Sequence, residues 1–138
     1  MDVAEWEGRI EAIHEQFYEQ IVGTAECGPF DGGCVVTAQA LQRVIGGEIV
    51  VLIRANDQAD HAVVLKDDQL WDFDGPLPPD AFIQRFNATE LSGMPFQCVS
   101  YRPIRDADLE KAYRGDELVE KLETLFRQAL EPQNSPAP

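Results

Sequence analysis

One cysteine, one histidine and two aspartates are the residues of this sequence whose types and surroundings suit covalent chemistry. Cys34 follows Gly32 and Gly33 and opens the apolar run CVVTAQALQRVI. A thiol in the first turn of a helix lies beside unpaired backbone N–H groups and the positive end of the helix dipole, which favour a thiolate. The two glycines allow a sharp turn into the helix and leave room for a substrate's backbone. Cys34 is therefore a candidate nucleophile, although a small buried thiol explains the same residue.

His61 begins a second apolar segment, HAVVLK, after the polar loop NDQAD. The segment QLWDFD follows a two-residue Asp67-Asp68 turn, and this pattern predicts a β-hairpin. Counting outward from the turn places His61 opposite Asp74, whereas a register shifted by one residue at both ends places Asp72 there. Either carboxylate could hold one imidazole nitrogen, and a cysteine, a histidine and an acid together make an activated thiol nucleophile. The simpler alternative is a surface histidine followed by an ordinary turn.

The elements that must position these residues alternate between two periods of hydrophobicity. Spacings of three and four predict helices, and short β-branched runs predict strands. Hairpin strands imply an antiparallel sheet packed by helices, which is an α+β domain over residues 1–131, with residues 132–138 as a disordered tail. The predicted elements are helices over 3–22, 34–45 and 80–86, strands over 48–54, 61–66, 69–74 and 96–102, a loop over 24–33, and one or two helices from residue 106.

Three short motifs resemble the papain-like cysteine fold over about residues 28–86. They are G-G-C opening an apolar helix, H-A-V-V on a strand, and W-D-F-D-G on the next strand. The order Cys, His, Asp is shared by papain-like peptidases, bacterial transglutaminase-like proteins, cell-wall endopeptidases and bacteriocin-leader peptidases, and small phage and bacterial proteins carry similar strings. The resemblance implies N-terminal helices packed on a small antiparallel sheet, with a C-terminal helix. It also implies that Cys34 is the nucleophile, His61 the general base and Asp72 the orienting acid, with Asp74 as the other candidate.

The sequence departs from papain-like peptidases at the residue that would stabilise the oxyanion. Those enzymes often carry a glutamine about six residues before the cysteine, where this chain has Gly28. The backbone amide of Cys34 and one from the loop that contains Gly32 and Gly33 are the substitutes expected here. The expected activity is thus a cysteine-dependent hydrolase or acyltransferase acting on an amide or ester bond. Peptide hydrolysis, protein deamidation, transglutaminase-like transfer and an inactive fold kept for binding all fit these residues, and none of them calls for a cofactor.

The charge of the chain limits its partners. It has 138 residues, with 25 acidic and 11 basic side chains and a net charge of −14. Phosphate backbones require clustered Lys and Arg, so nucleic acid is not an expected partner. A protein or peptide substrate with basic segments is the partner that this charge favours. No membrane helix and no signal peptide are expected, which predicts a cytoplasmic protein where it is made, and export by a signal-independent route stays compatible with this.

Two other readings compete with the cysteine enzyme. Cys27, Cys34, His61 and Cys98 supply the ligand types of a Cys₃His zinc site, but they lack a short C-x₂₋₄-C pair, so no metal site is expected. The small size and strong acidity also fit a non-enzymatic binding protein, such as an immunity protein or an inhibitor of a basic partner. In that case Cys34 would have no chemical role.

Overall fold

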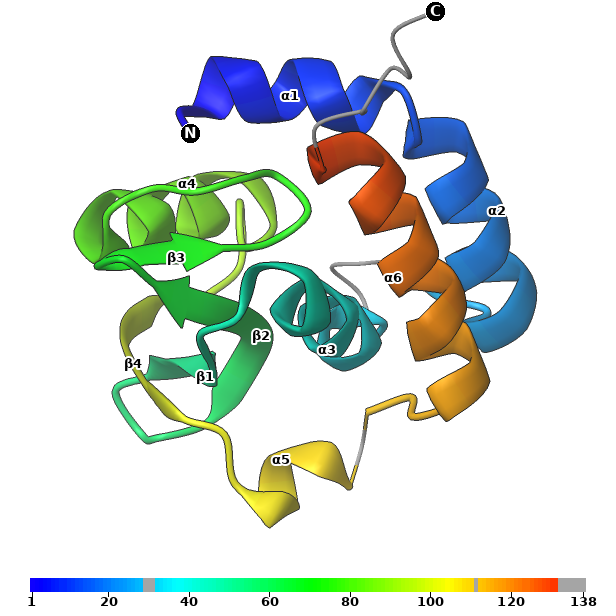
Figure 1. The fold of residues 1–138 in the computed structure, drawn as a ribbon. Coiled ribbons are helices and arrows are strands. Elements are labelled where there is room, and N and C mark those ends of the chain that lie inside the picture. Colours follow the sequence, from blue (N-terminus) through cyan, green and yellow to red (C-terminus); the bar gives the residue numbers. More distant parts are fainter. Residues whose placement is uncertain (29–31, 111, 132–138) are drawn as a thin grey trace, which may run out of the picture.

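The computed structural model describes residues 1–28, 32–110 and 112–131. Within these residues six helices and one four-stranded antiparallel sheet form an α+β fold, which confirms the predicted class (Figure 1). The predicted tail, 132–138, and residues 29–31 of the predicted loop lie outside the described residues. The elements are α1 (Val3–Glu11), α2 (His14–Ala25), α3 (Cys34–Ile45), β1 (Glu48–Arg54), β2 (Ala59–Lys66), β3 (Gln69–Trp71), α4 (Pro79–Thr89), β4 (Cys98–Pro103), α5 (Asp106–Leu109) and α6 (Asp116–Leu130).

The sheet has the strand order β3-β2-β1-β4 and is curled (Figure 1). Its hairpin between β2 and β3 has the predicted turn, because Lys66 pairs with Gln69. Asp67 and Asp68 both have positive φ, at 53° and 61°, as a type I′ turn requires. The turn therefore fixes the register of the hairpin, as the sequence predicted.

The second hairpin strand is shorter than predicted, since β3 ends at Trp71 and not at Asp74. The chain turns at once, with the N–H of Gly75 donating to the carbonyl of Asp72 at 3.0 Å. Leu77 then pairs with Leu70 through two backbone hydrogen bonds, on the side of β3 away from β2. Residues 72–75 are a turn, so the predicted strand over 69–74 is wrong at its end.

The N-terminal helix is also different from its prediction over 3–22, because it breaks into α1 and α2. The N–H of Ile13 bonds to the carbonyl of Ile10 at the junction, and α2 begins at the next residue. Both α1 and α2 contact α6, and Figure 1 shows that they run in different directions. The apolar spacing continues through the junction because the apolar residues of both helices are buried, Trp6 and Ile10 in α1 and Phe17 and Ile21 in α2. The periodicity therefore gave no sign of the bend.

The sheet has a hydrophobic core on each face. On one side α3 packs against β2 and against α6, and the buried side chains include Val51, Ala62 and Val64 from the sheet. On the other side α4 covers residues that alternate with these along the strands, including Val50 and Val63. Since α3 carries Cys34 and β2 carries His61, the packing of this helix on this strand sets the distance between the two candidate residues.

The two C-terminal helices agree with the one or two that were predicted from residue 106. The longer, α6, buries Leu118, Leu122 and Leu125 and packs against α1, α2 and α3. No helix in the described part of the chain is both long enough and apolar enough to cross a membrane.

Candidate active site

Cys34 is the first residue of α3, as the sequence predicted. Gly32 precedes it with φ at +122°, a conformation that favours glycine. At Gly33 an added Cβ would lie 2.6 Å from the carbonyl oxygen of Gly28 and 2.5 Å from the side chain of Ile21. The space at Gly33 is thus filled by the protein itself, and this glycine permits the close packing that places Cys34.

His61 lies where β2 has a strand neighbour on one side only. β3 pairs with residues 64–66 and ends there, so the described residues place no strand beyond His61 on that side. On the other side Leu52 pairs with His61 and Ile53 pairs with Ala59, which leaves Asp60 as an extra residue in a β-bulge. The imidazole is buried and stacks on Phe86 of α4, with ring centroids 4.7 Å apart. A bulge and a packed aromatic ring together fix the direction of this side chain.

Asp72, and not Asp74, is the acid that contacts the histidine. Its Oδ2 lies 2.8 Å from Nε2 of His61, and both side chains are buried. Its Oδ1 accepts the backbone N–H of Asp74 at 2.7 Å and lies 3.4 Å from Nη2 of Arg85. Asp74 itself is exposed. The carboxylate of Asp72 is therefore oriented from three directions, and the choice that the sequence left open falls on Asp72.

The electrostatics of Cys34 and His61 favour a proton on the imidazole. Burial raises the pKa of the Cys34 thiol, but a hydrogen bond from His61 and its charge, with backbone N–H groups, bring that pKa below its ordinary value. Burial lowers the pKa of His61, but hydrogen bonds and charges at Asp72 and Cys34 raise it to about 10. The thiol pKa falls and the imidazole pKa rises, so the pair is arranged to hold a thiolate beside an imidazolium.

The carboxyl of Asp74 has a raised pKa. Partial burial and the neighbouring charge of Asp72 raise the pKa of its carboxyl. The positive charges of Arg85 and His61 act in the opposite direction on Asp74, but burial and the charge of Asp72 outweigh them.

Cys34 and His61 line a cavity of about 150 Å³. Asp108 of α5 and Ala112 also line this cavity, and neither was a candidate from the sequence. A second cavity, of about 470 Å³, shares Ala59 and Asp108 with the first. Nothing in the pattern of the C-terminal segment distinguishes Asp108 from the other acids there, because only the fold brings α5 to the start of β2.

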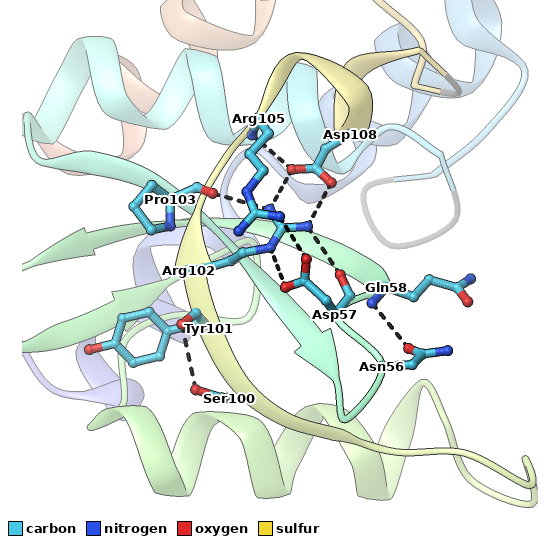
Figure 2. Close-up of polar contacts among 9 residues, drawn as sticks. All are labelled: Asn56, Asp57, Gln58, Ser100, Tyr101, Arg102, Pro103, Arg105 and Asp108. Atoms are coloured by element: carbon cyan, nitrogen blue, oxygen red, sulfur yellow. Dashed lines mark hydrogen bonds and ion pairs between the residues drawn. The ribbon is translucent and has the colours of Figure 1, made fainter.

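An ion-pair network contributes to the lining of this second cavity, and Figure 2 shows its contacts. Arg102 of β4 binds Asp57 through Nε at 2.8 Å and Asp108 through both Nη atoms at 2.8 and 3.1 Å. Arg105 binds Asp57 through Nη1 at 2.6 Å. The network joins the β1–β2 turn, β4 and α5, three segments that are separate in the sequence, so no local motif announces it.

The remaining cysteines lie in other surroundings. Cys98 is buried in the core under α4, and its Sγ donates to Asp60 at 3.4 Å. Burial and that carboxylate raise the pKa of the Cys98 thiol to about 12. Among the described residues no group of three or more His, Cys, Asp or Glu side chains is arranged to hold a metal ion.

Comparison of this chain with protein-family models, with curated protein sequences and with solved structures finds no match.

Proposed function

We propose that this protein is a cysteine-dependent hydrolase or acyltransferase acting on an amide or ester bond. One observation carries the proposal: the thiol of Cys34 at the start of α3 forms a hydrogen bond with His61 and lines the same cavity, and Nε2 of that buried imidazole lies 2.8 Å from Asp72. A buried carboxylate that holds one nitrogen of a histidine leaves the other nitrogen to serve the nucleophile. The papain-like resemblance of the sequence motifs agrees with this arrangement, since the nucleophile opens a helix that packs on an antiparallel sheet.

The proposed reaction has two steps. His61 takes the proton of Cys34 at Nδ1, and the thiolate attacks the carbonyl carbon of the substrate. The C–N or C–O bond of the substrate breaks, and the leaving amine or alcohol takes the proton from His61. Water then attacks the thioester on Cys34 with His61 as the base, which gives a carboxylic acid and restores the thiol. An amine in place of water gives acyl transfer.

Backbone groups supply the donors for the oxyanion in this proposal. The N–H of Cys34 belongs to the first turn of α3 and has no carbonyl partner within the helix. Gly28 offers no side-chain donor at the position where papain-like peptidases carry glutamine. A weaker oxyanion hole favours substrates that are easier to acylate from than an unstrained peptide bond, such as side-chain amides and esters. The net charge of −14 steers basic protein segments toward the molecule by an attraction that salt weakens.

The proposal predicts an unusual pH dependence of thiol reactivity. The rate of alkylation of Cys34 by iodoacetamide should reach its plateau at a lower pH than that of an ordinary thiol with a pKa of 9.0, because its own pKa is lowered. The rate should fall as the pH drops through that lowered pKa, since the thiolate is then protonated. Mass spectrometry of the alkylated peptides measures the rate for each cysteine separately, and Cys98 is the internal control with its raised pKa.

Acyl transfer is tested with p-nitrophenyl acetate, which needs no knowledge of the natural substrate. Release of nitrophenolate should be catalytic, and mass spectrometry should find the acetyl group on Cys34. Cys34→Ala should abolish both, and His61→Ala should return the alkylation profile of Cys34 toward that of an ordinary thiol. If wild-type Cys34 is alkylated no faster than Cys27 near neutral pH and is not acetylated, the enzyme proposal fails. A binding protein in which Cys34 has no chemical role then remains.

A further inference from the structure

A second cavity lies next to the cavity of the candidate nucleophile. Cys34 and His61 line a cavity of about 150 Å³, and a separate cavity of about 470 Å³ has Ala59 and Asp108 in common with its lining. The second space is large enough for a residue-sized portion of a substrate whose carbonyl lies at Cys34. The polar side chains that line it are in a position to contact such a portion.

Arg102 and Arg105 both line the second cavity, which we call the groove, and Arg102 already uses all of its N–H donors. Arg102 gives its Nε to Asp57, and its two Nη atoms bond to Asp108, to the carbonyl of Asp57 and to the carbonyl of Pro103 (Figure 2). These five bonds match the five N–H groups of a guanidinium. Carboxylates also raise its pKa above the ordinary value, first through Asp108. Arg102 thus has a structural role, since it holds Asp57 and Asp108 together in the wall of the groove.

The other arginine is arranged differently. Within the described part of the chain, the guanidinium of Arg105 makes one hydrogen bond, from Nη1 to Asp57. Its side chain is 59% exposed, and its backbone N–H donates to Asp108 at 2.8 Å. The residue is therefore anchored by its backbone at the wall that both cavities share. Its remaining N–H groups form a planar fork of the kind that binds a carboxylate with two parallel hydrogen bonds.

We propose that Arg105 is the specificity residue of this groove and binds a carboxylate on the substrate of Cys34. This inference rests on the proposed function, because it assigns the substrate class of the same site. The carboxylate is either the C-terminus of a peptide or an acidic side chain next to the bond that is attacked. The net charge of −14 repels anions at long range. A preference for a substrate with a carboxylate must therefore come from a nearby cation.

The test uses matched pairs of thiol-directed probes that differ only in one charge. Bromoacetyl-glycine is compared with bromoacetyl-glycinamide for a terminal carboxylate, and bromoacetyl-glutamate α-amide with bromoacetyl-glutamine α-amide for a side-chain carboxylate. The rate of alkylation at Cys34 is measured by mass spectrometry for wild type, Arg105→Gln and Arg43→Gln. Arg43 is in the last turn of α3, at the end away from Cys34, so its substitution changes the net charge equally without touching the groove.

In at least one pair, the ratio of the carboxylate rate to the amide rate should be about fivefold higher in wild type than in Arg105→Gln, the size of an exposed ion pair. Arg43→Gln should keep the wild-type ratio, and all three proteins should react equally with iodoacetamide. The pair that shows the preference identifies the source of the carboxylate. Ratios that Arg105→Gln leaves unchanged, in a protein whose Cys34 is still alkylated by iodoacetamide faster than Cys27 near neutral pH, overturn the assignment of Arg105 alone. A wild-type Cys34 that is alkylated no faster than Cys27 near neutral pH and is not acetylated overturns the proposed function.

Discussion

Cys34 and Cys98 are the same chemical group beside opposite charges. The first is next to His61, and its thiol pKa is lowered even though burial raises it. The second donates to Asp60, a carboxylate, and its pKa rises to about 12. The sequence pointed to Cys34 through its glycines and its helix, and it placed Cys98 within the strand predicted over 96–102. The charge beside each thiol is set by the β2 bulge, which no local pattern revealed.

At the residue scale the sharpest prediction separates the two aspartates. Asp72→Asn should lower the rate of nitrophenolate release by roughly two to four orders of magnitude, since the imidazole loses the carboxylate that orients it. It should also move the acid side of the Cys34 alkylation profile to higher pH. Without that charge the imidazolium is less stable, and the thiolate loses its cation.

Asp74→Asn is the matched control, because it removes a carboxylate two residues away and keeps the backbone N–H that donates to Asp72. It should leave both the rate and the profile nearly unchanged. Equal losses in the two variants, measured with the same ester, would show that overall negative charge matters and that the His61 contact does not.

At the element scale the hairpin shows how far the sequence could be read. The Asp67-Asp68 turn fixed the register correctly, but continuing that register placed Asp74 opposite His61, beyond the actual end of β3 at Trp71. The strand ends because the chain turns at Gly75, where φ is +98° and an added Cβ would lie 2.6 Å from the ring of Trp6. Trp6 also donates its Nε1–H to the carbonyl of Phe73 at 2.9 Å. A tryptophan from α1 thus shapes the turn that presents Asp72.

Gly75→Ala and Gly93→Ala should therefore have unequal effects on stability. Gly93 has a positive φ of 78° but no neighbour within 4 Å of an added Cβ, so its substitution should cost only the backbone strain, about 1–2 kcal/mol. Gly75→Ala adds the collision with Trp6, which raises the cost by about 1–3 kcal/mol. Urea unfolding monitored by circular dichroism measures both. Equal costs would mean that Trp6 moves aside freely.

At the scale of the whole molecule, α6 connects the N-terminal helices to the helix of the candidate nucleophile. It packs against α1, α2 and α3, and its apolar side was readable from the leucine spacing. The break between α1 and α2 was not readable, because it follows from wrapping two helices around α6 (Figure 1). The single domain expected over 1–131 stays a prediction, with a direct test in the cooperativity of unfolding.

Leu122→Ala should lower the free energy of unfolding by about 2–5 kcal/mol, because Leu122 is fully buried in α6. If residues 1–131 form one cooperative unit, circular dichroism and the fluorescence of Trp6 and Trp71 should shift together along the urea axis. Lys121→Ala, on the exposed side of the same helix, removes only a 3.6 Å ion pair to Glu117 and should change stability by less than about 0.5 kcal/mol. Separate transitions by the two probes would divide the chain into more than one unit.

The labelling rate of the buried Cys98 thiol also measures how often β4 separates from α4. With 2% of its surface exposed and a pKa near 12, it reacts with a disulfide reagent only when β4 and α4 separate. Its labelling rate in the native protein, compared with the rate in urea, gives the free energy of that opening. A value well below the global stability would mean that β4 detaches by itself. Because β4 carries Arg102, the same measurement would report how often Arg102 loses its hydrogen bonds to Asp57 and Asp108.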